Sequence, residues 1–103
     1  MAMAVAIIAL SGIPAKGDSA AGQATYKAKC AMCHGPDGTG KTPMGQSLKI
    51  PDLHSDAVQK KTDAELTQVI TKGSGKMPAY EAKLSKEQIT DLVGYIRDLA
   101  KKN

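Results

Sequence analysis

The pentapeptide at residues 30–34, CAMCH, holds both cysteines of the chain and one of its two histidines. C-x-x-C-H is the signature of covalent haem attachment. Cys30 and Cys33 can form thioethers with the two vinyl groups of one porphyrin. His34 would then be held beneath the iron, with Nε2 as a ligand and Nδ1 donating to a backbone carbonyl. The motif predicts one covalently bound haem c per chain.

The composition agrees with a large apolar group at the centre of the domain. The chain has 103 residues, enough for one domain, and contains no Phe, no Trp and three Tyr. Aromatic side chains normally supply the largest buried areas of a core, and small domains bury little surface. A porphyrin would fill that gap.

Three other uses of these residues compete with haem. A thiol–disulfide module of the thioredoxin kind needs a βαβ context, which the sequence lacks. A zinc site would combine Cys30, Cys33 and His34 with His54, across an irregular segment. A plain structural disulfide is the third. The net charge of +4 comes from scattered lysines without aromatic interleaving, so no nucleic-acid binding is expected.

The first half of the chain predicts one long helix followed by irregular structure. Asp18 or Ser19 can cap a helix over residues 20–30. A Gly- and Pro-rich loop follows His34, and residues 41–61 read as irregular apart from a short helical turn near 54–58.

Two capping boxes mark the helices of the second half. Thr62-x-x-Glu65 opens a helix that stops at Gly73, and S-x-x-Q at 85–88 opens a last helix that runs to about Lys101. No segment alternates with the period of a strand for long enough. We therefore expect an all-α fold.

The apolar N-terminal segment is distinct from the rest of the chain. Residues 1–10 are apolar and uncharged, and the run up to Pro14 is too short to span a bilayer. It matches the apolar core of a secretory signal. We expect residues 1–17 to be a signal or an apolar segment, and 18–103 to be the functional domain. Export suits a CxxC pair and predicts a periplasmic or otherwise exported protein; membrane association through this segment is an alternative.

With these marks, residues 20–102 resemble the small monohaem class I cytochromes c of bacteria. The resemblance rests on the CAMCH motif, on Gly22 and Tyr26 in the first helix, and on Leu92 and Tyr95 in the last. It implies a cytochrome c fold of three main helices and short turns around one haem. It also implies that the first and last helices cross closely, with Gly22 letting the backbones approach.

The resemblance implies that Met77 is the second axial ligand of the iron. Met77 lies in a loop, outside any helical stripe, and Pro78 biases it towards an extended backbone. A thioether is a soft ligand, and His/Met ligation raises the reduction potential. Met44 and His54 are alternative sixth ligands, whereas Met32 is expected to point away.

A further mark is Pro51-Asp52-Leu53. The resemblance implies that Pro51 offers its carbonyl to the proximal histidine and that Leu53 packs on the haem. Because the preceding loop is long, Pro36 and Pro43 are alternatives to Pro51.

Iron held by His34 and Met77 has no open position, so we expect a soluble electron carrier without a small-molecule substrate rather than an enzyme. A quinol-oxidising complex, a terminal oxidase or a reductase would bind it transiently. A haem enzyme or gas sensor with a displaceable sixth ligand is the alternative. We expect a monomer, with a dimer formed by exchange of the last helix as the alternative.

Five lysines are candidates to surround the exposed edge of the haem: Lys27, Lys29, Lys41, Lys72 and Lys76.

Overall fold

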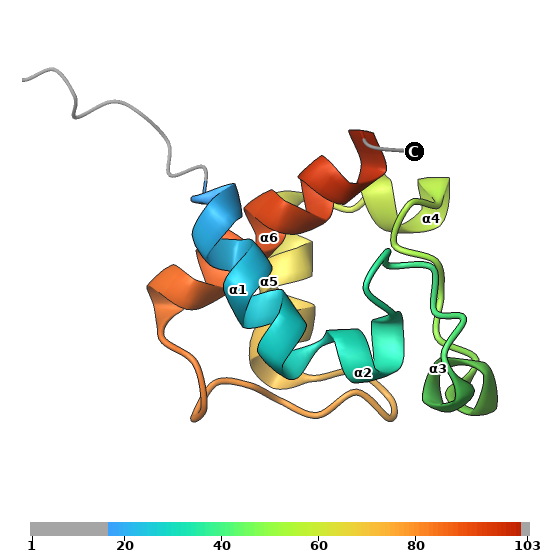
Figure 1. Cartoon of the computed structure of the whole chain (residues 1–103). Helices are drawn as coiled ribbons and strands as arrows, with labels where there is room; N and C mark the ends of the chain where they lie inside the picture. The colour runs from blue at the N-terminus through green and yellow to red at the C-terminus, as the bar shows by residue number, and fades with distance from the viewer. Residues whose placement is uncertain (1–16, 102–103) are drawn as a thin grey trace, which may run out of the picture.

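The structure is a computed structural model that describes residues 17–101 (Figure 1). The signal segment predicted at residues 1–17 thus falls almost entirely outside the described residues. No strand forms within 17–101, and the all-α expectation is confirmed. The helices are α1 (Ser19–Lys29), α2 (Ala31–His34), α3 (Pro43–Leu48), α4 (Asp56–Gln59), α5 (Asp63–Lys72) and α6 (Lys86–Lys101). None of them is long and apolar enough to cross a membrane.

The three longer helices begin where their caps predict. The Asp18 carboxylate accepts hydrogen bonds from the first turn of α1. At α5, Thr62 N donates to Glu65 Oε1 (2.8 Å) and Glu65 N donates to Thr62 Oγ1 (3.0 Å), which is the predicted capping box. The second box, at residues 85–88, forms in the same way before α6. Local sequence signals therefore set the ends of the main helices.

Helix α3 was not predicted, because its segment is rich in Gly and Pro. Pro43 occupies its first turn, where a missing N–H and a fixed φ do not oppose a helix. Thr42 caps it by accepting from Gly45 N at 2.8 Å. The Thr42 hydroxyl also donates to Cys33 O at 2.8 Å, which ties α3 to α2. The short turn expected near 54–58 is α4.

Helices α1 and α6 cross at close range (Figure 1). Gly22 is buried at the crossing, and a β-carbon there would collide with the Asp91 carbonyl. Next to it the rings of Tyr26 and Tyr95 lie 5.1 Å apart between centroids, tilted by 54°. The close approach that the resemblance implied for Gly22 is therefore present. The crossing of α1 and α6 therefore packs the first helix of the described chain against its last.

Candidate functional site

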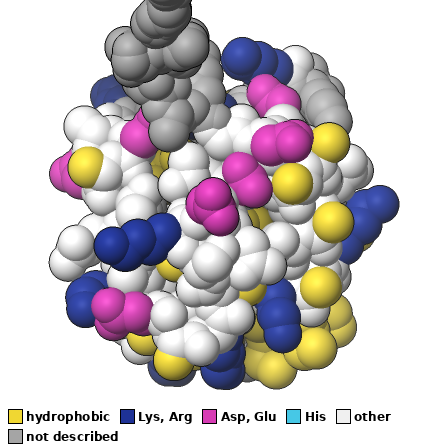
Figure 2. Space-filling view, turned by 90° about the vertical axis from the view of Figure 1, so that its left-hand side faces the viewer, with side chains coloured by type: hydrophobic (Ala, Val, Ile, Leu, Met, Phe, Trp, Pro, Cys, Tyr) yellow, Lys and Arg dark blue, Asp and Glu magenta, His cyan; other side chains and the backbone are white. Residues whose placement is uncertain are grey.

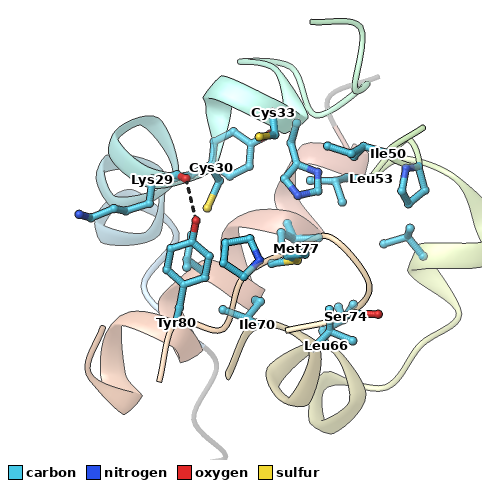
Figure 3. A pocket seen from close by; sticks show the side chains of 18 of the residues that line it. Lys29, Cys30, Cys33, Ile50, Leu53, Leu66, Ile70, Ser74, Met77 and Tyr80 are labelled. Atoms are coloured by element: carbon cyan, nitrogen blue, oxygen red, sulfur yellow. Dashed lines mark hydrogen bonds between the residues drawn. The ribbon is translucent and has the colours of Figure 1, made fainter. Parts of the chain in front are cut away.

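A cavity of about 390 Å³ opens between α2, α5, the segment 48–53 and the loop 74–80 (Figure 3). This volume falls within the range of small-molecule and cofactor sites. Its walls are mainly apolar, and each of the six helices contributes at least one lining residue. All the predicted site residues line it: Cys30, Cys33, His34, Pro51, Leu53 and Met77.

One helical turn brings the attachment motif to the cavity. Cys30 ends α1, its N–H donating to Tyr26 O at 2.8 Å. The chain then turns again through α2, where His34 N donates to Cys30 O at 2.9 Å, and Gly35 ends the turn at φ 87°. Because α2 is a single turn, two thiols and one imidazole are presented to the same space.

The Cys30 thiol lacks the character of a redox-active cysteine. Burial, followed by the neighbouring Cys33, raises the pKa of Cys30 to about 11. Cysteines that exchange disulfides have a lowered pKa and react as thiolates. The two thiols are free rather than joined in a disulfide. This environment counts against the thiol–disulfide alternative.

His34 is a neutral imidazole with one orphaned nitrogen. Burial lowers the pKa of His34, so the ring is neutral at pH 7, the form that ligates a metal. Its Nδ1 is buried and has no hydrogen-bond partner. The bond expected from Nδ1 to a carbonyl, with Pro51 as the implied acceptor, is absent, although Pro51 lines the same cavity. The unpaired atom is the nitrogen expected to donate to a carbonyl, whereas Nε2 is the atom expected to ligate the iron.

A tight turn holds Met77 at the cavity. Ser74 N donates to Met77 O (3.1 Å) and Met77 N donates to Ser74 O (2.9 Å). Gly73 has a φ of 82°, and a β-carbon there would lie 2.7 Å from Met77 O. The Met77 side chain is half-buried against the core and lies in the middle of the pocket in Figure 3. The thioether therefore shares the cavity with the thiols and the imidazole.

Tyr80 anchors this loop, a role that its sequence position did not reveal. Tyr80 N donates to Ile70 O at 3.0 Å, and its hydroxyl donates to Lys29 O at 3.3 Å (Figure 3). Burial raises the pKa of Tyr80, so the hydroxyl stays protonated as a donor. Through these bonds, the Met77 loop is fixed to both α5 and the end of α1.

The alternative ligands lie elsewhere. Met44 on α3 is 44% exposed and Met32 is 75% exposed, and neither lines the cavity. His54 also lies outside the lining, since its Nε2 is 2.6 Å from Asp37 O. Within residues 17–101, no group of three or more His, Cys, Asp or Glu side chains is arranged to hold a metal ion. The four-ligand zinc site therefore has no support in this geometry.

The residues at the cavity fit a haem. Apolar walls suit the porphyrin, two free thiols suit vinyl addition, and the imidazole and thioether suit the iron.

Tyr26 forms a buried hydrogen bond to the residue that follows the attachment motif. It is 1% exposed, and its hydroxyl donates to Gly35 O at 2.6 Å. Burial, followed by the nearby Cys30, raises the pKa of Tyr26, which keeps the hydroxyl protonated. This bond joins α1 to the residue directly after His34.

We expect Tyr26→Phe to destabilise the haem-loaded protein by about 1–1.5 kcal/mol, because the buried Gly35 O loses its 2.6 Å bond and keeps only the 3.1 Å bond from Gly38 N. Denaturant unfolding measures the change. Tyr80→Phe is the control, since it loses a longer, exposed bond and should cost less than about 1 kcal/mol. Equal losses of unfolding free energy in the two variants would show that the buried hydrogen bond contributes no more stability than the exposed one.

Comparison with known proteins finds relatives that cover most of this chain. The family described as "Cytochrome C oxidase, cbb3-type, subunit III" matches residues 17–96. Cytochrome c6 of Leptolyngbya boryana is 35% identical over 85 residues, which cover 82% of this chain and 96% of that protein. Cytochrome c6 of Synechocystis sp. is 30% identical over 96 residues, which cover 93% of this chain and 78% of that protein.

A longer relative and a solved structure show the same domain. The cbb3-type cytochrome c oxidase subunit FixP of Rhizobium etli is 38% identical over 86 residues, which cover 81% of this chain but 28% of that protein. The solved structure of the KustC0563 c-type cytochrome superposes with a TM-score of 0.70 at 29% identity, covering 76% of this chain and 95% of that one.

Proposed function

The chain belongs to the family of c-type cytochromes, and from this we propose that it is a small single-electron carrier whose haem c is held by Cys30 and Cys33 and ligated by His34 and Met77. When bound, haem c supplies an iron that alternates between the ferric and ferrous states. The observation that carries the proposal is the convergence of two thiols, an imidazole and a thioether on one apolar cavity.

The residues of the chain set the conditions for electron exchange. His34 and Met77 are both neutral ligands, and a thioether favours the ferrous state. The Met77 loop is fixed through Tyr80 and the His34 turn through Tyr26, so little needs to rearrange when the oxidation state changes. Leu53, which is 6% exposed, belongs to the wall that keeps water from the iron.

The proposed partners are redox proteins rather than small molecules: a quinol-oxidising complex, a terminal oxidase or a reductase. Support comes from relatives named as cytochromes c6 and as oxidase subunits. The candidate lysines are exposed, but Lys72 is paired with Glu81 at 2.9 Å. On the face shown in Figure 2, basic and acidic side chains are interspersed. Such a surface suits brief contacts. We further propose that residues 18–103 act in an exported compartment.

We expect Met77→Ala to lose the near-infrared charge-transfer band of ferric methionine-ligated haem and to have a lower reduction potential, because the soft ligand is removed. The band and a redox titration are the measurements. Met44→Ala is the control, since Met44 lies outside the cavity and is 44% exposed. Persistence of the band in Met77→Ala, or its loss in Met44→Ala, would reject Met77 as the ligand.

A further inference from the structure

The charged side chains of the cavity are all of one sign. Four lysines line it, and no Asp or Glu does within the described part of the chain. The chain as a whole carries both signs of charge in similar numbers, with 14 basic and 10 acidic residues. A cavity lined by one sign of charge favours a ligand of the other sign. The four are Lys29, Lys49, Lys61 and Lys76.

The four lysines divide into two pairs by their place in the chain. Lys29 directly precedes Cys30 and Lys76 directly precedes Met77. In Figure 3 the Lys29 ammonium extends away from the pocket, at the end where Cys30 lies. Lys49 instead precedes Ile50, and Lys61 comes just before α5. Ile50 and Leu66 of α5 lie on the side of the pocket away from Lys29 (Figure 3).

The backbones of this second pair are fixed. Lys49 has a φ of 57° and is the only residue other than glycine with positive φ within 17–101. This left-handed conformation is common where a helix ends, and Lys49 is the C-cap of α3, with its N–H donating to Gln46 O at 3.3 Å. At Lys61, N–H donates to Val58 O (3.1 Å), and O accepts from Arg97 Nη2 (2.6 Å).

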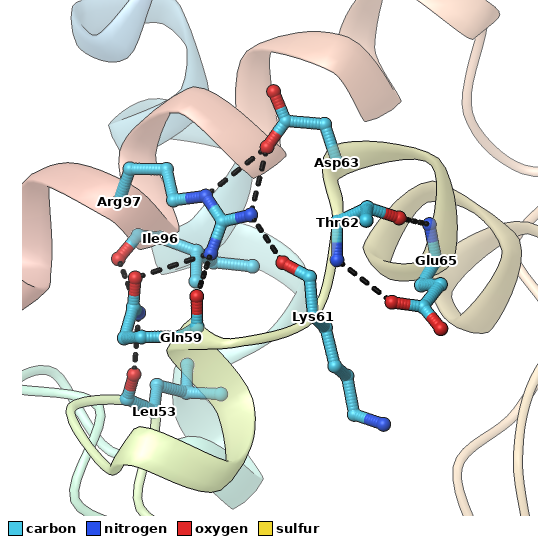
Figure 4. A network of polar contacts seen from close by, with 8 residues as sticks. All are labelled: Leu53, Gln59, Lys61, Thr62, Asp63, Glu65, Ile96 and Arg97. Carbon is cyan, nitrogen blue, oxygen red and sulfur yellow. Dashed lines mark hydrogen bonds and ion pairs between the residues drawn. The ribbon is translucent and has the colours of Figure 1, made fainter.

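Arg97 holds Lys61 as part of a wider network (Figure 4). Its Nη1 donates to Gln59 O at 3.1 Å, and its Nη2 and Nε donate to Asp63 Oδ1 at 2.9 and 3.1 Å. Gln59 Nε2 in turn donates to Leu53 O at 2.7 Å. The network therefore joins α6, the start of α5 and the Leu53 wall. In Figure 4 the Lys61 side chain runs away from it, free to bind elsewhere.

We propose that Lys49 and Lys61 bind the propionate carboxylates of the haem, with Arg97 and Gln59 as positioning residues for Lys61. The inference rests on the proposed function. A porphyrin tied through its vinyl groups to Cys30 and Cys33 has its carboxylates on the opposite side of the macrocycle. Carboxylates are ionised at neutral pH, and placing them against an apolar wall is costly unless they are paired.

Two consequences follow from such pairing. A cation beside a carboxylate stabilises its charged form and lowers its pKa. An ionised carboxylate near the iron favours the ferric state, so its protonation on acidification raises the reduction potential. A lysine that pairs with the carboxylate therefore moves the acid inflection of the potential–pH curve to lower pH and raises the potential above that inflection.

The test is a redox titration of haem-loaded protein at pH values between about 4 and 8. The parent is compared with Lys49→Gln, Lys61→Gln, the double variant and Lys29→Gln, which removes the same charge from the cysteine end. In the double variant we expect the inflection to move to higher pH by about one unit or more, with a lower potential at neutral pH. Lys29→Gln should leave the inflection in place.

Two results would overturn the proposal: an inflection that is unchanged in the double variant, or one that Lys29→Gln moves equally far. A Lys49→Arg/Lys61→Arg protein keeps the charges and should keep the parent curve; a shift as large as that of the glutamine protein would also reject the assignment. A parent protein without covalent haem would contradict the proposed function instead, so the two failures are distinguishable.

Discussion

Protein in which Cys30 and Cys33 are both replaced by alanine is expected to lack covalently bound haem. The two thiols are the only cysteines of the chain, and each forms one thioether in the proposed attachment. Without them the haem would be held only by its axial ligands and by packing, which are lost on denaturation. We therefore expect the denatured variant to have the mass of the bare polypeptide and to give no haem stain.

Met32→Ala provides the matched control for the cysteine variant. Met32 lies between the two cysteines but is 75% exposed and lies outside the cavity. It should keep both the haem mass and the stain. Haem that remained attached to the double-alanine protein after denaturation would show that the linkage lies elsewhere.

Gly22→Val is expected to destabilise the fold by about 3 kcal/mol or more. A β-carbon at Gly22 would collide with the Asp91 carbonyl and approach the Tyr95 β-carbon to 3.0 Å. The Asp91 atoms in contact are backbone within α6, so they cannot move without separating the two helices. Separation would also open the Tyr26–Tyr95 contact.

Denaturant unfolding of the haem-loaded protein measures this cost, with Ala24→Val as the control. Ala24 is exposed on the same helix, so its replacement should cost only the difference in helix propensity, roughly 0.5 kcal/mol. If the two variants lost the same stability, the close crossing would not be a constraint on this fold.

The helices that could be predicted are those with local signals. The capping boxes at Thr62 and Ser85 form as the sequence indicates, and the apolar period of α6 buries the expected face. Helix α3 was missed because Gly and Pro normally mark loops, yet Pro43 at the start of a helix is compatible with it. Arg97 gave no signal, because its partners come from the connection between α4 and α5.

The same distinction applies to the site. Cys30, Cys33 and His34 lie within five consecutive residues, so the motif alone was enough to predict them as site residues. Met77 was inferred from its loop position and from the resemblance, and the structure places it in the same cavity. The Tyr80 anchor is a contact between distant segments, and Lys49 and Lys61 reach one cavity from separate segments; no local pattern encodes either arrangement.

The central claim is a haem c whose iron is six-coordinate, with both axial ligands supplied by side chains of this protein. Its most direct test is the absorption spectrum of the reduced protein, purified from a host that attaches haem, recorded before and after addition of carbon monoxide. We predict a sharp α-band that carbon monoxide leaves unchanged. A colourless protein, or a spectrum that carbon monoxide alters at once, would contradict the account.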